Sequence, residues 1–118
     1  MKFTHTHYKF EREYPKLVRD RIPEIIWKNN GRKVSTRILR KDSEFFKYLL
    51  RKLVEEAVEL QKSKVHRNFE EELADIFEVI DSILRMKSKT KKDIVVIQKK
   101  KRKERGGFKK RILMLGKR

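Results

Sequence analysis

The sequence predicts a single, mainly α-helical domain built on an antiparallel helical hairpin core, with additional helices and one or two short β segments. Apolar residues recur at three- and four-residue steps over 43–63 and again over 69–87, which is the period of an amphipathic helix. A polar break separates these two segments, and so short a connection places neighbouring helices antiparallel. Asp42, Ser43 and Asn68 are the expected N-caps. With 118 residues, the chain has room for one modest core.

The segments before the hairpin are less regular. Residues 1–13 form an N-terminal extension whose loose alternation of aromatic residues fits a short strand, and the single domain spans 14–118. Residues 19–30 predict a short helix with Pro23 in its first turn, where a missing N–H costs little. The alternation of apolar and polar residues over 33–39 predicts a strand.

A further helix is expected after the hairpin. Thr90 with Asp93 three residues later is a capping pair, and the helix should run to Glu104. The pair Gly106-Gly107 should end it, because glycine adopts the positive φ angles that close a helix. The apolar stretch 112–115 then predicts a final strand or a docking segment within a basic C-terminal segment.

Charge is distributed very unevenly along the chain. The net charge is +17, but residues 1–54 carry +9, residues 55–84 carry −6 and residues 85–118 carry +14. There is no cysteine, which excludes disulfides, thiolate metal sites and cysteine nucleophiles. No apolar run approaches the length of a membrane span and the first residues do not resemble a signal peptide, so a cytoplasmic location without membrane contact is expected.

The acidic segment holds two similar groups of carboxylates. Glu55-Glu56-x-x-Glu59 lies in the first long helix, and Glu71-Glu72-x-x-Asp75 lies in the second. Side chains three apart lie about 60° apart on a helix, so each i, i+3 pair shares a face. On helical wheels, both pairs lie beside the same edge of the apolar stripe, while Glu55 and Glu71 point further toward water.

The two acidic pairs are also predicted to lie at the same height. In an antiparallel hairpin that turns at residues 65–66, facing residues have numbers that sum to about 131, as Glu56 with Asp75 and Glu59 with Glu72 do. Four carboxylates that meet between two helices repel one another unless a cation joins them. Oxygen-only ligands favour a hard divalent ion, so the pattern predicts Mg²⁺, with Mn²⁺ as the other choice. The rival interpretation is a solvated acidic hairpin.

The spacing Glu56-x-x-Glu59, twelve residues, Glu72-x-x-Asp75 resembles the signature of the all-α NTP pyrophosphohydrolase superfamily. This superfamily includes MazG, dimeric dUTPases and phosphoribosyl-ATP pyrophosphohydrolase. The segments 14–23 and 103–108 are similar to a compact MazG-like branch of house-cleaning phosphohydrolases. The resemblance covers about residues 14–115 and leaves 1–13 unexplained. It implies a nucleotide-binding hydrolase that uses Mg²⁺ to cleave a nucleoside triphosphate between its α and β phosphates, and a homo-oligomer, usually a dimer or tetramer.

The expected site follows from this resemblance and from charge. Metal binding is assigned to four carboxylates, and Glu55 is added to them as a catalytic candidate because any of the five can take the proton of the attacking water. The triphosphate brings negative charge of its own, so cations must face the cluster. The phosphate-binding candidates are Lys16, Arg19, Arg21, Lys103, Arg105 and Lys109.

Two other functions compete with this one. A basic nucleic-acid-binding module would use residues 87–118, and its affinity would fall steeply with salt. A catalytically silent relative would bind nucleotide without cleaving it. The sequence does not name the nucleotide, the general base or the role of the excess basic charge.

Overall fold

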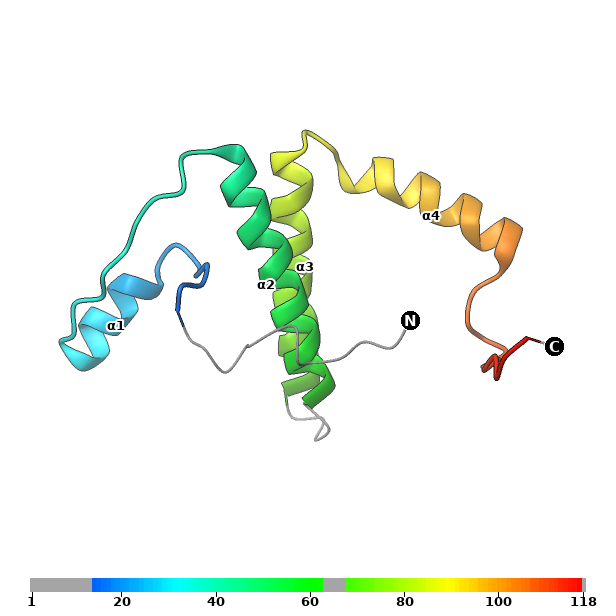
Figure 1. Cartoon of the computed structure of the whole chain (residues 1–118), viewed down its shortest axis with the longest axis horizontal. Coiled ribbons are helices and arrows are strands. Elements are labelled where there is room, and N and C mark those ends of the chain that lie inside the picture. The colour runs from blue at the N-terminus through cyan, green and yellow to red at the C-terminus, as the bar shows by residue number, and fades with distance from the viewer. Residues whose placement is uncertain (1–13, 63–67, 118) are drawn as a thin grey trace.

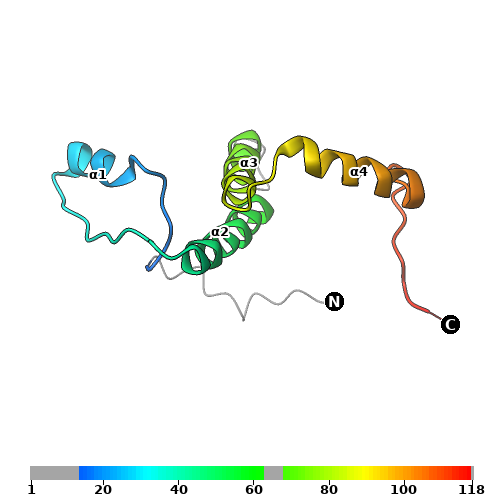
Figure 2. The same cartoon turned by 90° about the horizontal axis from the view of Figure 1, so that it is seen from above.

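A computed structural model describes residues 14–62 and 68–117, and within these ranges the chain is mainly helical. The helices are α1 (Ile22–Asn30), α2 (Asp42–Lys62), α3 (Phe69–Met86) and α4 (Lys91–Arg105). α2 and α3 pack side by side in opposite directions, as the apolar period predicts (Figure 1). α1 and α4 lie on opposite sides of this hairpin in both views (Figures 1 and 2). The predicted turn at 65–66 falls outside the described residues.

Most helix ends follow the predicted local chemistry. α1 has Pro23 in its first turn and ends at Gly31, whose φ of 64° lets its N–H donate to the Trp27 carbonyl. α4 begins with a capping box in which Thr90 and Asp93 bond each other's backbone N–H groups. α4 ends at Gly106, which has a φ of 81°. The Asn68 prediction is wrong in one respect, because its side chain makes no capping hydrogen bond.

The predicted strands do not form in the described part of the chain. Residues 33–39 and 112–115 are irregular, which corrects the β segments expected from their alternation and apolar content. A strand needs a neighbour for its backbone hydrogen bonds, and these two segments do not pair with each other or with another described segment. The strand considered within 1–13 lies outside the described residues.

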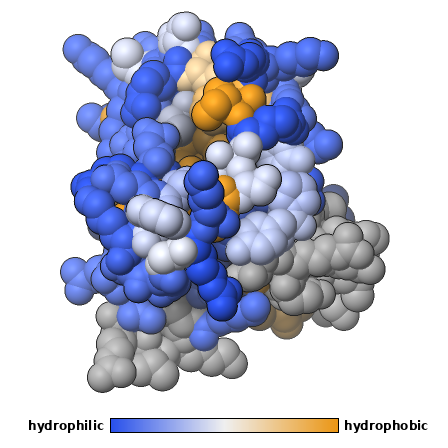
Figure 3. Space-filling view, turned by 90° about the vertical axis from the view of Figure 1, so that its left-hand side faces the viewer, coloured by the Kyte–Doolittle hydropathy of each residue, from blue (hydrophilic) through white to orange (hydrophobic). Residues whose placement is uncertain are grey.

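The core of the described residues is small and lies between the two hairpin helices. Of the residues that the structure describes, only Leu49, Val58 and Val79 are buried, with exposures of 2% to 7%. From the α1 side, the surface is mostly hydrophilic, with a few apolar side chains beside a hollow (Figure 3). No described helix is long and apolar enough to cross a membrane. The hairpin is therefore the packed unit on which any site must be built.

Candidate metal centre

The hairpin brings three of the predicted carboxylates together. Glu56 from α2 and Glu72 and Asp75 from α3 each offer an oxygen within 4.8 Å of the others, and all three are partly buried. Glu56 and Asp75 are one of the two pairs placed opposite each other by the sum of about 131. This geometry arises because Glu72 and Asp75 lie three residues apart on one face of α3, beside the face that packs on α2.

Glu59 and Glu55 lie at the edge of this cluster. Glu59 is exposed and does not join the group of three, although its charge helps to raise the pKa of Glu72. Glu55 is partly buried and pairs with Lys52. Among the described residues, three carboxylates therefore form the cluster, and two more lie beside it on α2.

Burial and mutual repulsion disfavour the ionised forms of two carboxylates in the cluster. Burial raises the pKa of Glu56, and the charge of Asp75 adds to the effect while Lys52 opposes it. Burial also raises the pKa of Glu72, again with a contribution from Asp75. The Oε2 atom of Glu72 is buried without a hydrogen-bond partner. An unpaired buried carboxylate oxygen is costly, so a cation beside this atom would be stabilising.

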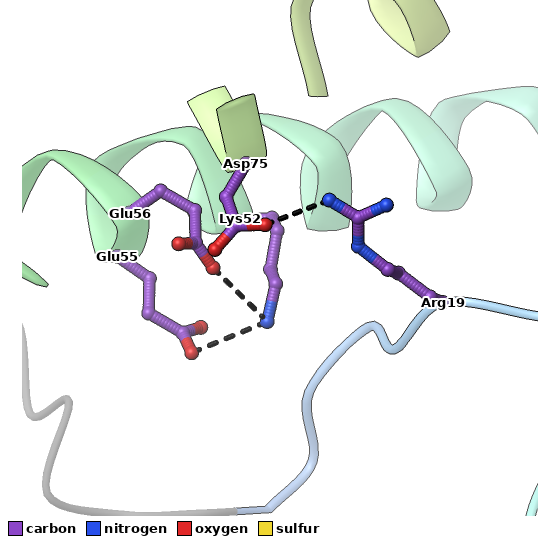
Figure 4. Close-up of polar contacts among 5 residues, drawn as sticks. All are labelled: Arg19, Lys52, Glu55, Glu56 and Asp75. Atoms are coloured by element: carbon purple, nitrogen blue, oxygen red, sulfur yellow. Dashed lines mark hydrogen bonds and ion pairs between the residues drawn. The ribbon is translucent and has the colours of Figure 1, made fainter. Parts of the chain in front are cut away.

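Two cationic side chains reach the cluster (Figure 4). The Nη2 atom of Arg19 lies 2.7 Å from Oδ1 of Asp75. The Nζ atom of Lys52 lies 3.3 Å from Oε1 of Glu55 and 3.6 Å from Oε1 of Glu56. The carboxylates here outnumber the cations, so Arg19 and Lys52 offset only part of the negative charge of the cluster.

These residues fit a divalent metal ion. All donors are carboxylate oxygens, which suit Mg²⁺ or Mn²⁺. One donor oxygen is buried and lacks a partner, and the carboxylates outnumber the cations that reach them. Glu56, Glu72 and Asp75 would hold the metal, and Glu59 is the fourth ligand that the sequence predicts. Acidic clusters are common on proteins, so the unpaired oxygen is the more specific of these observations.

The predicted phosphate-binding residues do not all gather at this cluster. Arg19 does, but Lys16 lies over the Tyr14 ring and Arg21 pairs with Glu24 on α1. The C-terminal candidates are exposed and lie at and beyond the end of α4, well away from the hairpin in both views (Figures 1 and 2). These are Lys103, Arg105 and Lys109. Of the six predicted phosphate-binding residues, a single chain therefore brings only Arg19 into contact with the acidic cluster in the part that the structure describes.

Lys52 is a site residue that the sequence analysis did not single out. It is about four-fifths buried, and it reaches two carboxylates of its own helix. Its spacing of three and four residues from Glu55 and Glu56 was a usable signal, because side chains at these spacings meet on a helix.

A separate open depression of 810 Å³ lies where the segment after α1 enters α2. Its wall contains none of the clustered carboxylates. Its lining is mostly basic and comprises Arg37, Ile38, Arg40, Lys41, Ser43, Glu44 and Lys47. Arg37 donates two hydrogen bonds to Glu44, at 3.0 and 2.9 Å, so part of this charge is already paired.

No family model, curated protein or solved structure matches this chain. The resemblance to the pyrophosphohydrolase superfamily therefore rests on the motif residues and their spacing.

Proposed function

We propose that this chain is a Mg²⁺-dependent nucleoside triphosphate pyrophosphohydrolase that releases a nucleoside monophosphate and pyrophosphate, with non-canonical nucleotides as the expected substrates. The observation that carries the proposal is the meeting of Glu56, Glu72 and Asp75 around a buried, unpartnered carboxylate oxygen. The same residues belong to the motif that resembles the superfamily.

The roles of the side chains follow from their charges and positions. When bound, Mg²⁺ would polarise the phosphate and activate a water molecule. Glu56, Glu72 and Asp75 orient that centre from two helices, so its geometry depends on the hairpin packing. Glu55 precedes Glu56 on α2 and lies beside the cluster. It is the candidate acceptor for the proton of the attacking water.

Arg19 is the best-placed residue for binding the triphosphate. Its guanidinium already lies beside the cluster, and a planar guanidinium with several donors suits phosphate oxygens. It pairs with Asp75 in this structure. A metal ion held by Asp75 would free the guanidinium to bind the substrate, where it would stabilise the negative charge that develops during cleavage.

Nucleic-acid binding remains the second candidate function because of one specific feature. α4 carries a run of basic residues from Lys99 to Lys103, all exposed, and none forms an ion pair with another described residue. Such a helix attracts a polyanion, and the affinity would fall steeply with added salt. The acidic cluster takes no part in this function.

Pyrophosphate release tests the first function. Canonical and modified nucleoside triphosphates are incubated with the chain, with and without Mg²⁺. The expected result is Mg²⁺-dependent pyrophosphate from at least one of them, and a loss of about 100-fold or more in Asp75→Asn and in Glu59→Gln. Asp81→Asn is the matched control, because it makes the same charge change on α3 outside the cluster. Full activity in Asp75→Asn would overturn the site assignment.

A further inference from the structure

The segment that follows α4 exposes apolar side chains that a folded chain normally covers. Phe108, Ile112, Leu113, Met114 and Leu115 are 76% to 97% exposed. Contiguous exposed apolar surface of this kind marks an interaction site on a soluble protein. We call residues 106–117 the C-terminal arm.

The first half of α4 has the same character. Ile94, Val95, Val96 and Ile97 are consecutive, so at 100° per residue they point to all sides of the helix. None of them is buried, because α4 does not pack extensively on another described helix. A helix that is apolar all round is expected to be covered on several sides. The described part of a single chain does not supply that cover.

The total surface supports this view quantitatively. The chain exposes 11,691 Å², whereas a compact monomer of this mass exposes roughly 6,800 Å². The 19 residues outside the described ranges would add at most about 3,400 Å² even as fully extended chain, so they do not account for the excess. The remaining excess is at least about 1,500 Å² per chain, or about 3,000 Å² for two chains, which lies within the range that obligate homodimers bury.

The distribution of charge indicates that the surface bound by the C-terminal arm belongs to a second copy of this chain. The arm belongs to the segment 85–118, which carries +14, and the hairpin segment 55–84 carries −6. Both views place the arm away from the hairpin of its own chain (Figures 1 and 2). The hairpin also leaves Leu50, Phe69 and Phe77 42% to 54% exposed, which provides apolar surface beside the acidic cluster's helices. A second copy offers the complementary surface in both hydrophobicity and charge.

We propose that the C-terminal arm docks on the α2–α3 hairpin of a second copy of this chain and brings Lys103, Arg105 and Lys109 to that copy's acidic centre. The centre of each chain is then completed by a basic flank from its partner. The part of this proposal that concerns catalysis rests on the proposed function, whereas the docking itself does not.

The docking is tested by the mass of the particle in solution, measured by light scattering after size exclusion. Wild-type chain should have at least twice the monomer mass of 14.4 kDa. The double variant Leu113→Asp, Leu115→Asp should be a monomer with the wild-type helix content, because these side chains are exposed in the single chain. Lys117→Glu is the control: it makes the same total charge change in the arm, removes no apolar side chain and should keep the wild-type mass. A monomeric wild type, or a double variant that stays oligomeric, would overturn the proposal.

Exchange of the basic flank is tested by mixing two inactive variants after joint unfolding and refolding. Glu72→Gln keeps the basic side chains and loses the acidic centre, whereas the double variant Lys103→Ala, Arg105→Ala keeps the acidic centre and loses the basic side chains. In a dimer completed in trans, half the particles are mixed and each has one intact site, so about a quarter of wild-type pyrophosphate release should return. A mixture of Glu72→Gln with Asp75→Asn should recover nothing.

Further measurements distinguish a failure of the docking proposal from a failure of the proposed function. Lys99→Ala, Lys100→Ala removes the same charge from α4 outside the assigned flank and should retain wild-type activity. If mixing restores no activity although each parent is inactive, the site is completed within one chain and the catalytic part is wrong. If wild type releases no pyrophosphate from any triphosphate tested, the proposed function fails, and the mass measurements still decide the docking.

Discussion

Arg19 donates a hydrogen bond from Nη2 to Oδ1 of Asp75 at 2.7 Å, and this ties the segment before α1 to α3 across 56 positions of the sequence. Both side chains are partly exposed, so the pair adds about 0–1 kcal/mol to the free energy of unfolding. Its importance lies in position, because it places the guanidinium beside the candidate metal centre.

Replacing Arg19 should affect activity much more than stability. Arg19→Ala is expected to lower kcat/KM for the triphosphate about 10- to 100-fold, the usual effect of losing a charged hydrogen bond. The melting temperature should change little. Arg21→Ala is the control, because Arg21 pairs with Glu24 instead of the cluster, and it should retain most of the activity. Equal losses in both variants would contradict the assigned role of Arg19.

Glu72→Gln should stabilise the metal-free chain. Because the pKa of Glu72 is raised by burial, its ionised form destabilises the folded state above that pKa, and this cost is relieved as the pH falls through it. Gln removes the charge and offers N–H donors to the neighbouring carboxylates. The expected result is a higher free energy of unfolding than wild type at neutral pH, measured by urea unfolding without metal.

The same variant should lose the response to metal. Added Mg²⁺ should raise the melting temperature of wild type, since ligand binding to the folded state alone is stabilising, and should leave Glu72→Gln unchanged. Glu71→Gln, with the same charge change at an exposed neighbouring position, should keep the wild-type response. A full Mg²⁺ response in Glu72→Gln would contradict the metal site.

The start of α4 gives a prediction with a defined pH dependence. Hydrogen bonds from the Thr90 backbone and side chain lower the pKa of Asp93 below its usual 3.8. A lowered pKa means that Asp93 stabilises α4 above about pH 3.8 and that this contribution is lost as the pH falls further. Asp93→Asn should therefore have less helix than wild type at pH 7 by circular dichroism, and the difference should shrink below pH 3.8. Thr90→Ala should cost about 1 kcal/mol of helix stability.

Local sequence patterns were sufficient to predict the helices and the α2–α3 hairpin. They did not predict how the remaining segments pack. The apolar period fixed the hairpin and the height of Glu56 against Asp75, and Gly31, Gly106 and the Thr90 cap marked helix ends because each depends on adjacent residues. The alternation over 33–39 did not make a strand, since a strand also needs a partner that local sequence does not specify. The same limit applies to the basic flanks: their charge predicted phosphate binding, but only the folded chain shows that Arg19 pairs with Asp75 while the end of α4 lies away from the hairpin (Figure 1).

The last prediction concerns Lys52, whose ammonium group and a bound Mg²⁺ would both neutralise the carboxylates of the cluster. Its ammonium group lowers the pKa of Glu56 and so opposes the effect of burial. Lys52→Met should leave Glu55 and Glu56 without this partner, and the metal-free chain should unfold at lower temperature. The cluster becomes more negative, so Mg²⁺ should bind more tightly at neutral pH and produce a larger rise in melting temperature than in wild type.

The pH dependence of Lys52→Met follows from the same charge. Without Lys52 the pKa of Glu56 rises further, so protons compete with Mg²⁺ at higher pH. The rise in melting temperature produced by Mg²⁺ is lost as the pH falls, and we call this part of the pH profile its acid limb. The acid limb should therefore lie at higher pH in the variant than in wild type. Lys62→Met removes an exposed lysine from the last turn of the same helix and should leave the limb in place. An unmoved limb in Lys52→Met would show that Lys52 does not act on the cluster, because its charge would then have no effect on the protonation of Glu56.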